Sequence, residues 1–427
     1  MLKYIRAFWN TPQLKKKLLI TTAVLIIFRL VTFIPVPGAD VDNLKQIISR
    51  YEVLGLLDLF SGGTFFNFSI IALGLNPYIN ASIIMQLFTM VFPKLEELSK
   101  EGEYGRRKIN QYTRYLTVPL SLLQSFGIVT FLQRGDLAVF GQLSTLDLLA
   151  VILTLVAGAI FLMWLSELIT ENGIGNGASV IILVGIVSRL PVVLVQTFSL
   201  LDETKIFSLI GLLVIAFLVI TGIVFVNEAH RRIPVQYARR AKDSTQTTQM
   251  TYLPLRVNQA GVIPIIFAIS LVSLPSILGS LLTTSKSPWL LDLSSKLVTY
   301  FQTTNPVYYT TYFVLVLGFT YLYTAVSFNP TKIAEEIKKH GGFIPGIRPG
   351  RPTSEYLNFI LNRITLPGAI FLGVIAVLPF VVTQLTNFQN LAIGGTGLLI
   401  VVSVILETSK QIRSMLIQRS YEGFLGK

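Results

Sequence analysis

The stretch Ser61–Met90, SGGTFFNFSIIALGLNPYINASIIMQLFTM, is apolar enough for a membrane, but its pattern divides it into two parts. Asn76-Pro77 is typical of a helix start, because Asn can cap free amides and Pro loses no needed hydrogen bond at the first helical position. The helix that follows, Leu75–Phe92, can cross most of a bilayer, whereas Phe65–Leu73 falls far short of the roughly 20 residues that a span needs. A short helix hinged by glycines onto a longer one has to lie inside protein or in a water-filled cavity. The pattern therefore predicts a pore element.

The composition places the chain in a membrane. Hydrophobic residues make up 52% of its 427 residues and charged residues only 13%, against about 25% charged in ordinary soluble proteins. There is no cysteine, which excludes disulfides and thiolate metal ligands, and two histidines leave little room for metal chemistry. The sequence also lacks the Walker A, HExxH and GxSxG motifs. We therefore expect a polytopic membrane protein that is not an enzyme and uses neither a cofactor nor a metal.

Nine further apolar runs predict nine more transmembrane helices, which makes ten with Leu75–Phe92. The first run follows Lys15-Lys16-Lys17 and precedes no small-residue cleavage site, so we interpret it as a retained span. Its Arg29 is expected to snorkel or to pair with an acidic residue of a loop. The nine runs are Leu18–Val36, Tyr112–Leu132, Leu143–Leu168, Ala178–Thr197, Ile206–Val226, Val257–Leu282, Tyr308–Phe328, Ile364–Leu385 and Leu391–Leu406.

The basic residues orient these spans. Most of the 35 Lys and Arg residues fall before the first span, in 94–114, 231–256 and 332–363, and after Leu406. All of these segments lie on one side of the predicted topology. Because cytoplasmic loops carry the excess of Lys and Arg, both termini are expected in the cytoplasm.

The ten spans divide evenly at Asp202-Glu203, into an N-terminal half of residues 1–202 and a C-terminal half of residues 203–427. An odd number of spans in each half makes the second half run inverted relative to the first, as in many transport proteins. The predicted fold is therefore an all-α membrane protein of two inverted five-helix halves around a central pore.

Two predicted cytoplasmic loops, Asn227–Arg256 and Asn329–Arg363, are longer and more basic than a connector needs to be. A generic basic loop is explained as readily by contact with anionic lipid as by a protein partner. The run Gly346–Gly350, however, mixes rigid Pro with permissive Gly around Arg348, and such a loop presents a shaped tip, as a docking site does. A third loop, GIGNGAS at Gly173–Ser179, lies between two spans and is interpreted as a tight turn capped by Asn176 rather than a nucleotide loop.

Seven collinear segments resemble the SecY family, the channel subunits of the bacterial protein-translocation machinery. The resemblance covers nearly the full length of the chain, and an ordered set of seven segments is far more specific than any one of them. The segments are FSGGTFFNFSIIALGLNPYINASIIMQL, KEGEYGRRKINQYTRY, GIGNGAS, RRIPVQYARR, LPLRVNQAGVIPIIF, FNPTKIAEEIKKHGGFIPGIRPG and GGTGLLIVV.

The resemblance implies a clamshell of two five-helix halves around an hourglass pore, with a ring of apolar side chains closing its waist. Such rings are usually bulky throughout, so Ala178 is a departure from the pattern. Taken singly, each ring position is explained more readily as ordinary core or lipid-facing packing. The matching positions are Leu75, Ile79, Ala178, Ile182, Ile266 and Ile400.

The resemblance also implies a short plug helix, matching about residues 61–73, that fills the outer funnel. A lateral gate to lipid is implied between the second and seventh spans, at Gln86 and Asn258, although Asn258 could equally make a helix-packing hydrogen bond. The plug positions are Ser61, Gly62, Gly63, Phe65, Asn67, Ile70 and Leu73, and the docking positions on the basic loops are Arg231, Arg232, Arg239, Arg240 and Arg348.

The function that the resemblance implies is a protein-conducting channel of the bacterial cytoplasmic membrane, which translocates unfolded polypeptides and releases apolar segments sideways into lipid. The expected partners are the small membrane subunits SecE and SecG, the SecA motor, the ribosome, signal peptides, nascent polypeptides and membrane lipids. The alternative is a secondary transporter with discontinuous helices, which would keep an ionisable site at mid-span. An apolar ring without charge favours the channel.

Overall fold

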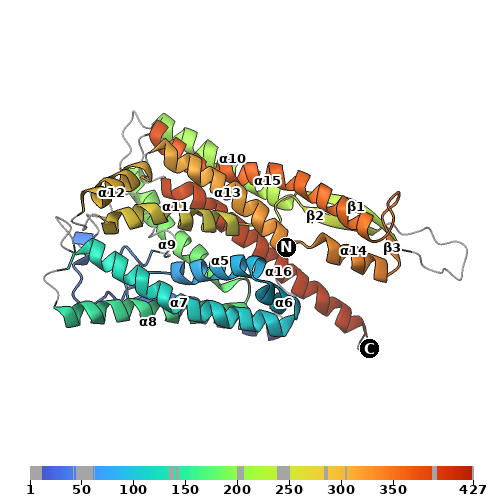
Figure 1. Ribbon diagram of the computed structural model, residues 1–427, viewed down its shortest axis with the longest axis horizontal. Coiled ribbons are helices and arrows are strands. Elements are labelled where there is room, and N and C mark those ends of the chain that lie inside the picture. Colours follow the sequence, from blue (N-terminus) through green and yellow to red (C-terminus); the bar gives the residue numbers. More distant parts are fainter. Residues whose placement is uncertain are drawn as a thin grey trace, which may run out of the picture.

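A helix stands at each of the ten predicted spans in the computed structural model, and most of these helices run along the long axis of the molecule (Figure 1). The structure describes residues 12–41, 43–44, 61, 63–133, 139–140, 144–199, 206–237, 251–282, 287–302, 305–386 and 392–425. The earlier helices are α2 (Pro12–Thr32), α5 (Asn76–Val91), α6 (Pro93–Lys100), α7 (Glu103–Leu132), α8 (Thr145–Asn172) and α9 (Gly177–Ser199). The later helices are α10 (Ile206–Glu228), α11 (Ile263–Leu282), α12 (Pro288–Tyr300), α13 (Pro306–Ser327), α14 (Pro330–Lys339), α15 (Arg351–Thr386) and α16 (Ala392–Leu425).

Several of these helices are suited to a membrane. Within the described ranges, three helical stretches are long and apolar enough to cross one: Thr145–Asn172, Pro306–Lys339 and Arg351–Val382. Shorter apolar stretches lie in α9, α10 and α11. The chain is a multi-pass membrane protein, while the total of ten spans stays a prediction. The predicted boundary between the halves, Asp202-Glu203, lies outside the described residues.

Three helices extend at least nine residues beyond one end of their predicted spans. α7 begins at Glu103 rather than Tyr112, α15 begins at Arg351 rather than Ile364, and α16 continues to Leu425. The apolar runs in the sequence indicate only the part of each helix that can lie in the hydrocarbon core of a membrane, and so they miss its polar ends. The polar extensions continue as helix, supported by ion pairs one turn apart such as Arg107–Glu103 and Arg351–Glu355.

The start of α5 corrects one expectation. The N-cap is Leu75 and not Asn76, no side chain caps the free amides, and Pro77 lies in the first turn. The backbone amide of Ile79 already donates to the carbonyl of Leu75 at 2.9 Å. The helix therefore begins one residue earlier than an Asn cap requires. The Asn176 prediction is confirmed, because its side-chain oxygen accepts a hydrogen bond from the backbone of Ser179 at the start of α9.

A small sheet corrects the all-α prediction. Strands β1 (His230–Tyr237) and β2 (Thr251–Arg256) form an antiparallel pair from the first basic loop, and β3 (Gly342–Phe343) from the second loop adds to β1. Ile233 and Val235 alternate with more exposed neighbours and pack into a cluster with residues of α14 and α15. The two basic loops are therefore one folded unit, which lies with α14 at the end of the molecule opposite α12 (Figure 1).

Candidate functional site

The six predicted ring residues all belong to, or pack against, one large hydrophobic cluster, which we call the waist cluster and which also takes in residues of α2, α8, α10, α13 and α15. Leu75 and Ile79 belong to α5 and the residue before it, Ile182 to α9, Ile266 to α11 and Ile400 to α16. All five are between 0% and 7% exposed. A side chain lining a water-filled passage would be accessible to solvent, so no such passage runs past these five.

Ala178 is the exception in the ring. It is only partly buried and packs against the waist cluster from the first turn of α9. Its methyl group reaches less far than the isoleucine one turn later, Ile182. The five bulky ring positions are therefore buried members of the cluster, whereas the small one is partly buried and packs against it.

The segment predicted as a short plug helix is a run of turns, which we call the turn segment (residues 63–75). Phe68 has φ of 39° and Gly74 has φ of 60°, and a non-glycine residue in the left-handed region interrupts a right-handed helix. The amides of Phe68, Ala72 and Gly74 each donate to the carbonyl three residues earlier, which closes turns rather than a helix. The helical form of the plug prediction is therefore wrong.

The backbone of the turn segment is bonded to the chain that leaves α2. The amide of Val36 donates to the carbonyl of Phe68 at 2.9 Å, and the amide of Ile70 donates to the carbonyl of Ile34 at 3.0 Å. The hydroxyl of Ser69 donates to the carbonyl of Val31 at 2.7 Å. Buried backbone groups need such partners, and here they lie in α2 and its exit rather than in a local helix.

The side chains of the turn segment join two clusters. Ile71 belongs to the waist cluster, whereas Phe65, Phe68 and Leu73 belong to a second cluster with residues of α7 and α8. Of the other predicted plug positions, Ser61 is buried, Asn67 and Ile70 are half-buried, and Gly62 lies outside the described residues. The segment therefore fills space directly beside the ring.

The two predicted gate residues have different surroundings. Gln86 of α5 donates to the hydroxyl of Ser82 at 3.5 Å, and its side-chain oxygen is buried with no hydrogen-bond partner among the described residues. Asn258 precedes α11 and donates to the side-chain oxygen of Asn227 at 2.9 Å, while its own oxygen accepts from the amide of Gly261. The helices themselves, α5 and α11, are in contact. The pairing of Gln86 with Asn258 stays a prediction.

The predicted docking arginines that the structure describes are exposed. Arg231 and Arg232 lie on β1, and Arg348 lies in the loop between β3 and α15. The tip is shaped as expected, with φ of 82° at Gly346 and 106° at Gly350, and the hydroxyl of Thr353 donates to the carbonyl of Arg348 at 2.9 Å. Arg239 and Arg240 lie outside the described residues.

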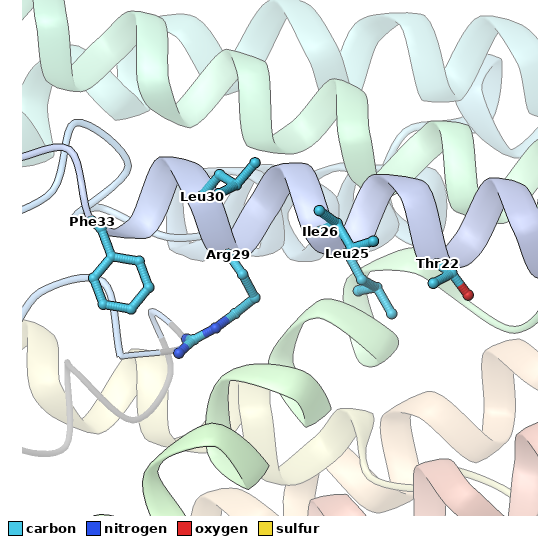
Figure 2. Close-up of a pocket in the computed structure, with 6 residues that line it drawn as sticks. All are labelled: Thr22, Leu25, Ile26, Arg29, Leu30 and Phe33. Atoms are coloured by element: carbon cyan, nitrogen blue, oxygen red, sulfur yellow. The ribbon is translucent and has the colours of Figure 1, made fainter.

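Arg29 bonds to a neighbouring helix rather than to a loop acid. Its guanidinium donates to the hydroxyl of Ser188 on α9 at 3.0 Å and lies 5.5 Å from the centroid of the Phe33 ring. Figure 2 shows Arg29 extending from the face of α2 that also carries Phe33, and this face lines an open, almost wholly apolar groove of about 290 Å³. Within the described ranges, no group of three or more His, Asp and Glu side chains is placed to hold a metal ion.

Known proteins resemble this chain along nearly its whole length. The SecY family model matches residues 69–409. The SecY subunit of the protein translocase of Mycobacterium bovis is 44% identical over 97% of this chain and 98% of its own, and that of Streptomyces griseus is 45% identical over 99% of each. The chain belongs to the SecY family.

Solved structures share its fold at lower identity. A SecY protein whose plug domain stabilises the closed state of the translocation channel has a TM-score of 0.62 at 18% identity, over 94% of this chain and 92% of that one. Sec61 in the canine ribosome–channel complex has a TM-score of 0.56 at 17% identity, over the same shares. The SecY-family chain is thus a protein-translocation channel and not an enzyme, and a secondary transporter is not favoured.

Three features of this SecY-family channel escaped sequence reasoning. The sheet was missed although Ile233 and Val235 already alternate in RRIPVQY, which is a strand signal. The bond between Asn227 and Asn258 joins residues far apart in the chain, and no local pattern pairs them. The same holds for Arg189 of α9, whose guanidinium carbon lies 4.7 Å from the centroid of the Phe66 ring.

Proposed function

We propose that this channel conducts polypeptides between two five-helix halves, residues 1–202 and 203–427, through a waist that Leu75, Ile79, Ala178, Ile182, Ile266 and Ile400 close at rest. The observation that carries this proposal is the gathering of these residues from both halves into the waist cluster. An apolar collar fits many side chains without binding any of them, and it excludes ions because water leaves a narrow apolar constriction.

The turn segment is the plug in this proposal. It lies against the ring through Ile71 and fills the adjoining space through Phe65 and Phe68. A structural neighbour with this fold has a plug domain that stabilises its closed state. The plug here is a bonded run of turns, which can leave its seat as a unit while the helices around it persist.

The lateral gate is assigned to the contact between α5 and α11. The side-chain oxygen of Gln86 is buried with no hydrogen-bond partner within the described ranges, and this supports an opening seam because an unsatisfied polar atom at apolar depth destabilises the closed packing. Cysteines at Gln86 and Asn258 would be the only ones in the chain. Oxidation should join them and stop both translocation and lateral release, and reduction should restore both. A pair that never crosslinks would place the seam elsewhere.

Docking is assigned to the sheet and the Arg348 tip. The exposed arginines suit an acidic protein surface or ribosomal RNA, and the structural neighbour Sec61 was solved with a ribosome. Because the chain has no Walker A sequence, the energy for translocation has to come from a partner such as SecA or the ribosome. SecE and SecG complete the membrane complex in this proposal, and the termini lie in the cytoplasm, with the channel in the bacterial cytoplasmic membrane.

The channel function is tested by reconstitution. Proteoliposomes that contain this chain with SecE should protect an unfolded secretory precursor from protease when SecA and ATP are added, and should not do so without either. The matched control is the same complex carrying the oxidised Gln86→Cys, Asn258→Cys pair. Protection that does not depend on this chain, or accumulation of a small solute coupled to an ion gradient, would contradict the proposal.

A further inference from the structure

The turn segment rests against the N-terminal half at three places. Its backbone is bonded to the exit of α2 through Val36 and Ile34, as described above. Its second support is Gly158 of α8, where an added Cβ would lie 1.9 Å from the carbonyl oxygen of Ile70. Its third support is Arg189 of α9, which reaches both Phe66 and Gly63.

Gly158 lets the turn segment approach the backbone of α8. No side chain larger than hydrogen fits there, because the carbonyl group of Ile70 fills the place of the first carbon atom. We call this contact, in which the backbone at Ile70 packs on Gly158, the Gly158 seat. It depends on the absence of a side chain and includes no hydrogen bond or charge interaction that would orient the segment.

Arg189 supplies the directional contact. Its guanidinium lies over the face of Phe66, an arrangement in which the ring quadrupole attracts the cation. Its stem lies so close to Gly63 that an added Cβ would be 3.5 Å from both Cγ and Cδ. The charge is half-buried among apolar helices, where a cation–π contact is stronger than in water. The guanidinium of Arg189 therefore joins α9 to Phe66 of the turn segment, while its stem passes beside Gly63.

A second arginine steadies the part of α9 that carries Arg189. Arg29 of α2 donates to the hydroxyl of Ser188, the residue directly before Arg189. This bond connects α2 and α9 beside the turn segment. The base of the Arg189 side chain is therefore held in place relative to α2, to whose exit the segment is bonded.

We propose that Arg189 is a positioning residue that latches the turn segment shut: its cation–π contact with Phe66 holds the segment in the Gly158 seat, and opening requires this contact to break. This inference rests on the proposed role of the turn segment as the plug. The latch joins the plug to the N-terminal half alone, so the plug remains with that half until Arg189 releases Phe66.

The test measures plug release in two ways. The first is resting ion conductance of the purified complex in planar bilayers. The second is the rate at which a membrane-impermeant thiol reagent modifies Asn67→Cys, the only cysteine in the chain. Arg189→Leu should raise both by about two- to thirty-fold, the range expected for loss of one cation–π contact. Arg189→Lys keeps a cation and should restore most of the wild-type behaviour.

Two comparisons separate a latch from a general structural role. Phe66→Leu should match Arg189→Leu, and the double variant should be no leakier than either single variant, because both remove one contact. Lys296→Leu removes a positive charge from α12, far from the turn segment in the sequence, and should change neither readout. The latch proposal would be wrong if the effects of Arg189→Leu and Phe66→Leu on the two readouts added in the double variant. It would also be wrong if Lys296→Leu changed the readouts as much as Arg189→Leu does.

Deleting residues 65–70 separates the latch from the plug itself. If the deletion leaks and Arg189→Leu does not, the latch is wrong while the plug proposal stands. If neither leaks although precursor translocation is normal, the plug proposal fails and the latch with it. Translocation measured on each variant shows in both cases that the channel is assembled.

Discussion

The waist cluster and the three-stranded sheet of β1, β2 and β3 both bring together segments far apart in the sequence. Side-chain burial holds the first together, whereas backbone hydrogen bonds hold the second. At the waist, residues such as Ile182 and Ile400 are buried apolar side chains on helices, and no hydrogen bond between side chains is needed to bring them together. In the sheet, backbone hydrogen bonds hold β1 to β2 and β3, and the charged side chains of Arg231 and Arg232 remain exposed. Apolar side chains suit a closed waist because they make no strong bond to a passing polypeptide. Exposed arginines suit a docking site because their charges are available to a partner.

The largest expected effect is at the waist. Ile182→Asn together with Ile266→Asn should wet the collar, because each amide brings hydrogen-bonding groups into an apolar constriction that otherwise excludes water. Resting conductance in planar bilayers should rise by on the order of tenfold or more. Ala178→Ile should lower any residual current, since it adds bulk at the small ring position.

The matched control for the waist is Val187→Asn, on the same helix as Ile182 but with an exposed side chain. It introduces the same polar group away from the collar and should leave the resting current at background. If the double asparagine variant also stays at background, the collar is not the barrier, and the turn segment seals the pore by itself.

The next effect is at the docking tip. Arg348→Glu replaces an exposed cation by an anion and should weaken SecA binding about tenfold at low salt, with a smaller loss at high salt because salt screens exposed charges. Binding to reconstituted complex at two salt concentrations measures this. Lys296→Glu makes the same change of charge on α12, a helix at the end of the molecule opposite the sheet (Figure 1), and this variant should bind SecA normally. An equal loss in both variants would attribute docking to net charge rather than to the tip.

A smaller effect is expected at Asn258, which lies between β2 of the sheet and α11, a helix that contributes to the waist cluster. Asn258 connects the end of α10 to the start of α11, so Asn258→Ala removes the hydrogen-bond partner of the Gly261 amide and the donor to the side-chain oxygen of Asn227, whose amide group still donates to Ser403. Unpaired buried groups cost about 1–3 kcal/mol, and thermal unfolding in detergent should show the loss. Asn305→Ala removes two exposed hydrogen bonds at the start of α13, one from the amide of Val307 and one to the carbonyl of Thr299, and should cost less because water can replace both. Equal losses would mean that the junction is no more than a helix cap.

The smallest effect is the ion pair of Glu228 and Lys410, whose charged atoms are 2.8 Å apart. The hydrogen bond from Lys410 lowers the pKa of the Glu228 carboxyl. The pair therefore contributes its stability above the ordinary carboxyl pKa, and this contribution is lost as the pH falls through the lowered pKa. The Glu228 side chain is exposed and that of Lys410 is partly exposed, so solvent weakens the pair and we expect a fraction of a kcal/mol. Unfolding temperatures of wild type and Lys410→Met should differ at pH 7, and this difference should shrink as the pH falls below the ordinary carboxyl pKa and through the lowered one.

The sequence by itself determined the helices, the break between Gly74 and Asn76, and the shaped tip around Arg348. These features depend on apolar runs, glycine and proline, whose physical effects are local. Only the tertiary structure decided the conformation of the turn segment that precedes this break. The pattern of Phe65–Leu73 predicts a short helix. In the structure its backbone is hydrogen-bonded to Ile34 and Val36, in the chain that leaves α2. These bonds outweigh helix formation, because a segment this short is not stable as a helix on its own.

The same division applies to the functional residues. An apolar residue such as Ile266 is predictable as buried, because burial depends on its own chemistry. The contact of Arg189 with Phe66 and the bond of Asn258 to Asn227 are not predictable, because each depends on a partner that a different helix or turn brings near. The sequence by itself determined which side chains avoid water, since hydrophobicity belongs to each residue. Only the tertiary structure decided which polar and charged groups meet, since hydrogen bonds and cation–π contacts act over a few ångströms and require a particular orientation.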